Sequence, residues 1–325
     1  MLRQLKVPIG WGALFKRTAS EVMADNCLGL AAQLAYYFFL ALFPALLFLV
    51  ALASFFPLGN VVDTVTATLA RVAPGEVLQI IQDQILKIAH SKSGGLLTLG
   101  MLGTIWSTSS GVDAIIDTLN QAYDIQEGRP WWRVKLTALA LTVGLALFVI
   151  VATILVVAGP ELAEHVANWA HLGREFAWTW KIVQWPLVFI LISLAVAVVY
   201  YFAPDAKQEW IWITPGSVLA TVLWLVISLG FRFYVQHFGS YNATYGAIGG
   251  VIVLMLWFYL SGLSVLVGAE LNSEIEHASP YGKDPGEKAA GEKKMLGALA
   301  ERTRTEQMRN GTFKPALTAS NCDLR

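Results

Sequence analysis

The sequence predicts an all-α protein, a polytopic membrane bundle of about six transmembrane helices with an amphipathic helical loop on its outer side. Two observations lead to this prediction. The 325 residues are 56% hydrophobic and only 14% charged, whereas soluble globular chains carry about 25% charged residues. The apolar residues also gather in separate stretches of about 20 residues or more, the length that a helix needs to cross a bilayer.

The domain organisation follows from these stretches. A charged segment, residues 1–27, precedes the membrane domain, which we expect over residues 28–272. Five stretches are predicted as spans without difficulty: 28–56, 134–158, 182–203, 211–235 and 245–269. A sixth, 95–119, is weaker because polar residues fill its second half, and we expect it to cross buried among its neighbours. Residues 273–325 turn polar and contain several prolines, which predicts a disordered tail.

The distribution of Lys and Arg predicts the orientation, because cytoplasmic loops carry the excess of basic residues. With six spans, the outer loops contain only Arg71, Lys87, Lys92, Arg174 and Lys181, and Arg232 lies within a span. All other basic residues then fall inside, so both termini are expected in the cytoplasm. A five-span alternative, which omits 95–119 and places the N-terminus outside, fits the rule almost as well.

The loop between the first two spans, residues 59–93, is too polar to cross the membrane. Its apolar residues nevertheless recur at helical spacing: Val61, Val65, Leu69 and Val72, then Val77, Ile80, Ile81, Ile85 and Ile88. This pattern predicts two short amphipathic helices that divide near Pro74. They either rest on the membrane surface or cap the bundle.

A polar face on the weak span is the candidate functional site. Ser109, Asp113, Asp117 and Asn120 follow Trp106 at steps of three and four, so they share one face of a helix. An ionisable group near the bilayer centre costs about 2.5 to 3.5 kcal/mol, which favours a role in function. The topology brings these residues near Gln33 and Glu270, and together they could line a cavity open to the cytoplasm. The alternative is a frayed helix end with ordinary hydrogen bonds between helices, in which Arg129 and Arg133 neutralise Asp117 or Glu270.

Two sites within the spans predict kinks. Pro44 lies in the middle of the first span, and Pro215 with Gly216 lies early in the fifth. Proline removes a backbone donor and clashes with the preceding turn, so these helices should break or bend and free backbone carbonyls. Such kinks either open a cavity or serve shape alone.

Motifs of catalysis and cofactor binding are missing from the sequence. The five histidines are scattered, and there is no HExxH, GxxxxGK[ST], GxSxG or CxxC pattern. We therefore expect neither an enzyme active site nor a metal or cofactor. The 23 acidic and 23 basic residues balance, so no overall basic field favours nucleic acid as a partner.

Several segments together resemble a known family. The first span contains Ala35-Tyr36-Tyr37 and Phe43-Pro44, and the run Leu96 to Trp106 is followed by Asn120, Tyr123, Arg129 and Trp132. Later come Pro215-Gly216, Tyr245-Gly246-Ala247, Trp257 and Gly268-Ala269-Glu270-Leu271-Asn272. Over roughly residues 20–272 this pattern resembles the YihY/BrkB family of bacterial inner-membrane proteins. The resemblance implies a six-span protein; some members are named virulence or serum-resistance factors, and the family has long been labelled a tRNA-processing ribonuclease.

Three functional classes remain open. The first is a transporter-like or lipid-handling protein of the cell envelope, with membrane lipids as partners and a lipid or small solute as substrate. The second is a non-enzymatic envelope scaffold that binds its partners through the outer loop or the tail. The third and least favoured is a ribonuclease, because phosphodiester hydrolysis needs clustered metal ligands or acid and base groups beside a basic surface.

Overall fold

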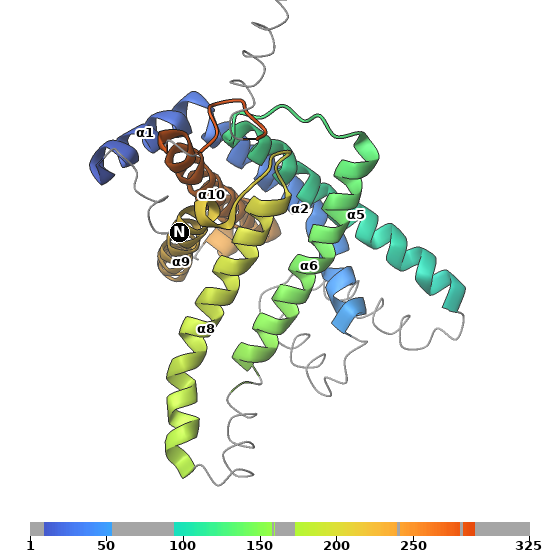
Figure 1. Cartoon of the computed structure of the whole chain (residues 1–325). Helices are drawn as coiled ribbons and strands as arrows, with labels where there is room; N and C mark the ends of the chain where they lie inside the picture. Colours follow the sequence, from blue (N-terminus) through green and yellow to red (C-terminus); the bar gives the residue numbers. More distant parts are fainter. Residues whose placement is uncertain are drawn as a thin grey trace, which may run out of the picture.

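The computed structural model of the chain describes residues 10–53, 94–157, 159, 173–238, 241–279 and 282–289. The predicted outer loop, 59–93, and residues 290–325 of the predicted tail lie outside this part of the chain. Every regular element within it is an α-helix, which confirms the all-α prediction (Figure 1). The helices are α1 (Trp11–Ala24), α2 (Cys27–Ala53), α5 (Gly94–Ala122), α6 (Trp131–Val157), α8 (Gly173–Phe202), α9 (Trp210–Phe238) and α10 (Tyr241–Ala278).

Four stretches of the described chain are long and apolar enough to cross a membrane. They are Trp131–Val156 in α6, Ile182–Phe202 in α8, Trp212–Tyr234 in α9 and Gly249–Ala278 in α10. Helix α2 contributes a shorter apolar stretch, Cys27–Leu42. Helix α5 corresponds to the weak span, and the polar residues in its second half make it less hydrophobic than the other predicted spans. The predicted number of about six spans is therefore approximate, whereas the membrane-protein class stands.

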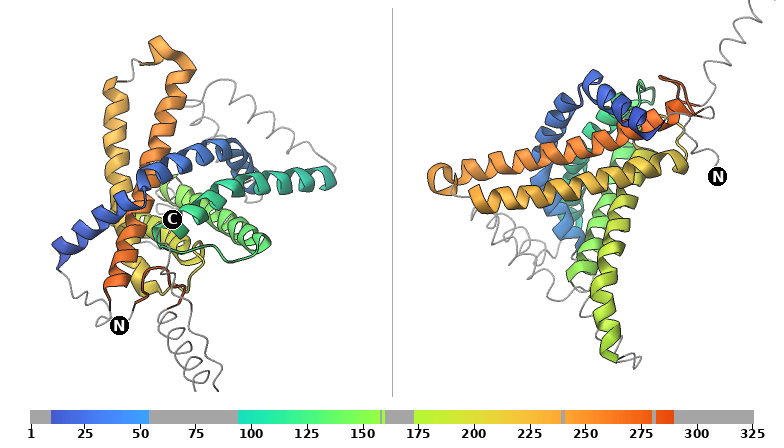
Figure 2. Two further views of the ribbon diagram at one scale, coloured as in Figure 1. Left: turned by 90° about the horizontal axis from the view of Figure 1, so that it is seen from above. Right: turned by 90° about the vertical axis from the view of Figure 1, so that its left-hand side faces the viewer.

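The long helices form antiparallel pairs, α2 with α5, α6 with α8 and α9 with α10. One end of every long helix lies in a common region, which we call the polar end. It is formed by the helix ends at Cys27, Ala122, Trp131, Phe202, Trp210 and Ala278. Away from this end the pairs point in different directions, so the helices spread apart instead of lying side by side along their whole length (Figure 2).

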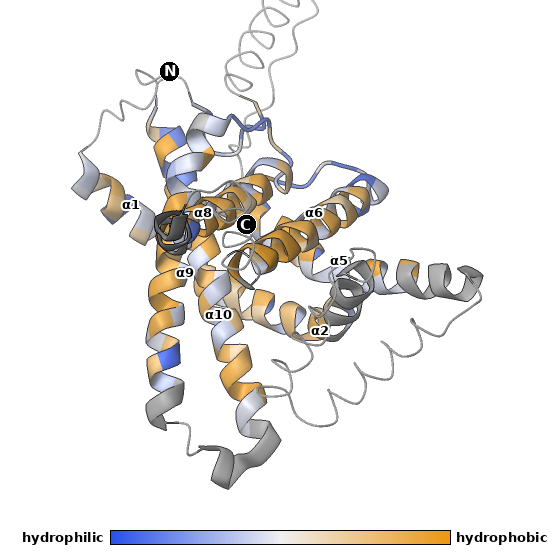
Figure 3. Ribbon diagram, turned by 90° about the horizontal axis from the view of Figure 1, so that it is seen from below, coloured by the Kyte–Doolittle hydropathy of each residue, from blue (hydrophilic) through white to orange (hydrophobic). Residues whose placement is uncertain are grey.

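Burial follows the same division. At and near the polar end, side chains from all six long helices form one core, including Leu34, Leu119, Leu141, Tyr200, Ile213 and Leu266. Toward the other ends, large apolar side chains such as Ile190, Leu229 and Ile252 are exposed, and the helices there are largely hydrophobic around their surface (Figure 3). Apolar surface of this extent suits a lipid environment better than water.

Helix α1 is not among the elements predicted from the sequence. Leu14, Thr18 and Val22 recur every four residues and form its buried face. Leu14 packs in a small apolar cluster with Trp212 of α9 and with Leu271 and Ile275 of α10. This cluster holds α1 against the polar end.

The C-terminal boundary also differs from the expectation. We expected the last span to end at 269 and a disordered tail to begin at 273, but α10 continues to Ala278. Ile275 extends the buried face of the helix, since it is only 1% exposed. Residues 282–289, which we call the C-terminal strap, then lie against the loop between α8 and α9, where the backbone N–H of Lys207 donates to the Lys288 carbonyl at 2.8 Å.

Candidate functional site

The polar end brings together most of the buried polar side chains of the described chain. Its centre is the crossing of α9 and α10, where Gly216 lies against Gly268. A Cβ atom on Gly216 would overlap the Gly268 carbonyl oxygen and the Asn272 side chain. The two backbones therefore approach each other as closely as glycine allows.

Asn272 stabilises the kink-prone start of α9. Its Oδ1 accepts a hydrogen bond from the Gly216 N–H at 2.7 Å, and its Nδ2 donates to the Ile213 carbonyl at 3.2 Å and to the Tyr123 hydroxyl at 3.3 Å. These bonds satisfy backbone groups on either side of Pro215, where proline disturbs the helical pattern. Neither proline interrupts its helix, since α2 continues through Pro44 and α9 through Pro215. The bends predicted at these two sites stay a prediction.

A second polar cluster joins α2 to α10. The Cys27 thiol donates a hydrogen bond to Glu270 Oε1 at 3.2 Å, and Glu270 is only 1% exposed. Asp25, in the turn between α1 and α2, also interacts with Glu270. Burial and the nearby Asp124 carboxylate raise the pKa of Asp25. Glu270 is thus fixed among protein groups and does not line an open cavity with the polar face of α5.

A third cluster connects the loops that follow α5 and α8. The buried Asn120 donates from Nδ2 to Glu127 at 2.9 Å, and its Oδ1 accepts from the Asp205 N–H at 2.9 Å. Arg129 forms an ion pair with Glu127 at 2.6 Å and donates to the Ala203 carbonyl at 2.8 Å. Asn120 and Arg129 therefore hold the two loops in a defined relative position.

The pKa of Glu127 provides a test of this cluster. Partial burial acts to raise that pKa, but hydrogen bonds from Arg129 and Asn120 outweigh it and lower the pKa from 4.5 to about 2. A carboxylate with a depressed pKa contributes stability above its unfolded pKa, and this contribution disappears as pH falls toward the folded pKa. We therefore expect wild type to melt at a higher temperature than Glu127→Gln at neutral pH, with the difference shrinking between about pH 5 and pH 2.

Thermal unfolding of both proteins in the same detergent across this pH range measures the difference directly. Other carboxylates titrate in both proteins, so their effects cancel in the comparison. A difference that stays constant down to about pH 2 would show that Glu127 is not held as the charged form.

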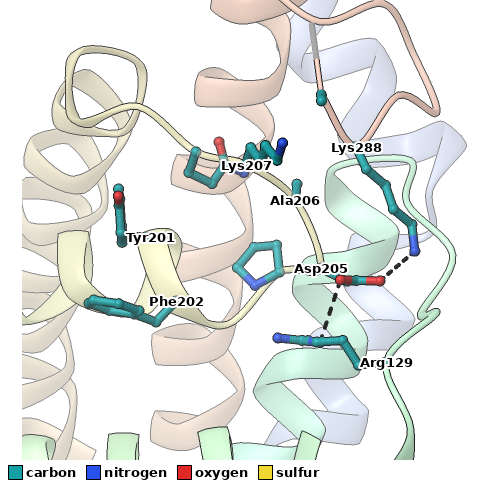
Figure 4. A pocket seen from close by; sticks show the side chains of 10 residues that line it. Arg129, Tyr201, Phe202, Asp205, Ala206, Lys207 and Lys288 are labelled. Carbon is teal, nitrogen blue, oxygen red and sulfur yellow. Dashed lines mark hydrogen bonds and ion pairs between the residues drawn. The ribbon is translucent and has the colours of Figure 1, made fainter. Parts of the chain in front are cut away.

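A pocket of about 640 Å³ opens beside this third cluster. It is lined by Arg129, by the end of α8 with the loop that follows it, and by Lys288 and Ala289 of the C-terminal strap. Asp205 lies between Arg129 and Lys288 and forms ion pairs with both, while Tyr201 and Phe202 lie on the other side of the opening (Figure 4). The ring of Tyr201 stacks on Trp210, with centroids 4.8 Å apart. The pocket therefore has a charged wall and an aromatic wall.

The predicted site residues do not gather around one cavity. Asp113 forms an ion pair with Lys135 of α6 at 2.7 Å, and Lys135 lies 4.6 Å above the Trp106 ring. Ser109 donates to a carbonyl of its own helix at 2.7 Å, Asp117 is exposed, and Gln33 is half-buried on α2. Of these residues, Asn120 and Glu270 take part in the buried polar clusters, and they belong to separate clusters. The structure thus supports interhelical bonding, the alternative we left open, for Asp113 and Glu270.

The residues that line the observed pocket were missed, with the exception of Arg129. Under the alternative without a cavity, Arg129 neutralises Asp117 or Glu270; in the structure it pairs with Glu127 and Asp205. The one signal that could have found Asp205 is its place directly after Pro204 in a short loop between two spans. Within the described residues, no group of three or more His, Cys, Asp or Glu side chains is arranged to hold a metal ion.

Comparison with known proteins identifies the family. The model of the family described as virulence factor BrkB matches residues 18–293. The chain belongs to the virulence factor BrkB family. The matched region contains α2 to α10 together with the C-terminal strap and the whole pocket, so the three polar clusters lie within the part shared with the BrkB family.

Individual relatives agree with this assignment. The putative ribonuclease-like protein YfkH of Bacillus subtilis is 36% identical over 75% of this chain and 88% of its own length. UPF0761 membrane proteins of Xanthomonas campestris and Tolumonas auensis are 28% identical, over 77% and 58% of this chain, and the chain spans 58% of the length of each. No solved structure matches the chain. This BrkB-family chain is thus an integral membrane protein.

Proposed function

We propose that this protein binds a phospholipid, with the headgroup in the pocket beside Asp205 and the acyl chains along α8. The observation that supports the proposal is that α8 has an exposed apolar face and ends at the pocket. Exposed apolar side chains on α8 recur at helical spacing at Val183, Leu187, Ile190 and Leu194. About two turns farther along the helix, Tyr201 and Phe202 line the pocket. An amphipathic ligand matches this sequence of surfaces.

The charges of the pocket suit a headgroup with a phosphate. Lys207 and Lys288 contribute ammonium groups and Arg129 a guanidinium, which favour phosphate oxygens. The Asp205 carboxylate forms ion pairs with Arg129 and Lys288, and its negative charge also favours the amine of a zwitterionic headgroup. The aromatic wall of Tyr201 and Phe202 supports a pocket at the headgroup level of a bilayer, where aromatic side chains are enriched.

We also propose that the polar end faces the cytoplasm of a bacterial inner membrane. Basic residues support this orientation, because Arg129, Arg133, Lys207, Lys283 and Lys288 all lie at this end. A lipid in the pocket would then come from the inner leaflet.

The test compares lipid retention by matched variants. Phe202→Ala combined with Lys207→Ala removes one aromatic and one basic side chain from the pocket lining. We expect this double variant to lose most of the phospholipid that copurifies with wild type in mild detergent. Phe233→Ala is the control, since Phe233 is similarly exposed, at 61% against 51% for Phe202, but lies on α9 outside the pocket. Mass spectrometry of extracted lipid measures the amounts; equal retention by a folded double variant and by the control would refute the proposal.

The name of YfkH favours one alternative, cleavage of RNA. Purified wild type and the Phe202→Ala, Lys207→Ala double variant can be incubated with tRNA and divalent metal ions in the same preparation. If both proteins cleave tRNA, and the cleaving activity elutes with the folded chain in gel filtration, the activity belongs to this protein. Ribonuclease activity would then replace lipid binding as the proposed function.

A further inference from the structure

Helix α1 has a second apolar face that the rest of the described chain does not cover. Its buried face, Leu14, Thr18 and Val22, lies against α9 and α10. Beside that face, Phe15 lies four residues after Trp11 and eight before Met23, so the three side chains fall within about a third of the helix circumference. They are 66%, 51% and 67% exposed in the order Trp11, Phe15 and Met23. Three large apolar side chains on one side of a helix are unfavourable in water and call for an apolar neighbour.

We propose that α1 is an interfacial helix that lies on the bilayer surface, with the stripe of Trp11, Phe15 and Met23 among the lipids at the boundary between headgroups and acyl chains. This proposal is independent of the pocket and of the lipid bound there. It assigns a bilayer surface, and not another protein, as the partner of the stripe.

The position of α1 in the fold supports this partner. The helix ends at Ala24, and only Asp25 and Asn26 separate it from α2, whose apolar stretch begins at Cys27. Asn26 has a φ of 52°, so the chain turns sharply at this point. In Figures 1 and 2, α1 projects outward from the region where the long helices meet. A helix joined in this way to a membrane helix stays at the level of the membrane boundary.

The charges near the stripe identify the kind of lipid. Lys16 is exposed and borders the stripe on the helix surface, whereas Arg17 interacts with Glu274 of α10. Two further basic residues, Arg3 and Lys6, precede the helix in the sequence. Basic residues flanking an apolar helix face favour a leaflet that contains anionic phospholipids.

Spin labels on the full chain in nanodiscs test the proposal. In a Cys27→Ser, Cys322→Ser background, single labels are placed by Phe15→Cys and Met23→Cys on the stripe and by Ser20→Cys on the exposed polar side of the same helix. In discs with phosphatidylglycerol we expect labels 15 and 23 to collide severalfold more with oxygen, and severalfold less with a water-soluble nickel complex, than label 20. In discs of phosphatidylcholine alone this contrast should weaken.

Other results would overturn the inference. Equal nickel collision at positions 15, 20 and 23 means that the stripe faces water, and protection from both oxygen and nickel means that protein covers it. If labels 15 and 23 differ from label 20 to the same extent with and without phosphatidylglycerol, the stripe does not prefer anionic lipid. Hydroxyl-radical footprinting of the unmodified chain gives a second readout, in which Met23 and Trp11 should be protected in phosphatidylglycerol discs and oxidised readily if the stripe faces water.

Discussion

Gly216→Ala is expected to destabilise the protein by about 3 kcal/mol or more, or to prevent its folding. The added methyl group would overlap the Gly268 carbonyl oxygen and the Asn272 side chain. The first of these is backbone, so α9 and α10 would have to separate at their crossing. Separation would also break the hydrogen bond from the Gly216 N–H to Asn272. Gel filtration of a fluorescent fusion and thermal unfolding in detergent measure the loss.

Gly230→Ala is the matched control, since Gly230 also lies in α9 and a Cβ there meets nothing within 4 Å. Its effect should be neutral or slightly stabilising, because alanine favours helix over glycine by about 1 kcal/mol. Similar stability of the two variants would mean that the helices do not cross at Gly216 as described.

Lys283→Ala is expected to cost about 3 to 5 kcal/mol, because it leaves a buried carboxylate without its partner. The Lys283 ammonium lies 3.2 Å from Glu276 of α10, and the two side chains are only 4% and 5% exposed. Burial lowers the pKa of Lys283, although Glu276 acts against this shift. The same ammonium donates to Gln208 at 3.1 Å and to the Lys207 carbonyl at 3.2 Å, so its loss also frees the C-terminal strap. Thermal unfolding measures the loss of stability, and cleavage by a protease in the chain after Ala278 measures the release of the strap.

Lys288→Ala serves as the comparison within the same strap. Lys288 also pairs with a carboxylate, Asp205, but its side chain is 38% exposed, and exposed pairs contribute about 0 to 1 kcal/mol. If Lys283→Ala were as mild as Lys288→Ala, the strap would not be anchored through a buried ion pair.

The sequence predicted the helical membrane architecture because lipid imposes a strong local requirement. Each span must satisfy its own backbone and present apolar side chains over about 20 residues, so α6, α8, α9 and α10 could be found from single stretches of sequence. The same reasoning missed α1, whose apolar residues form a stripe among charged ones, and it placed the end of the last span too early because Glu270, Asn272 and Glu276 are polar although buried.

The candidate site was harder to predict because its contacts join residues far apart in the chain. Pro215-Gly216 and Gly268 to Asn272 both stood out in the sequence, but nothing local indicates that Asn272 bonds to Gly216. Asp113 shares a helix face with Asn120, yet its partner is Lys135 on the next helix. Asp205, which joins Arg129 to Lys288, lies in a loop without helical periodicity. The spacing of residues in the sequence shows which side chains share a helix face, whereas the partner of each polar side chain depends on how the helices cross.

The unequal division of contacts along the helices has a mechanical consequence. Ion pairs and close backbone contacts fasten the long helices to one another at the polar end, while the exposed apolar sides farther along leave lipid as their neighbour. In a thicker or thinner bilayer the helix pairs would therefore tilt relative to the rigid polar end, at a modest energetic cost. Such a molecule adapts to the thickness of the membrane without disturbing the contacts at its polar end.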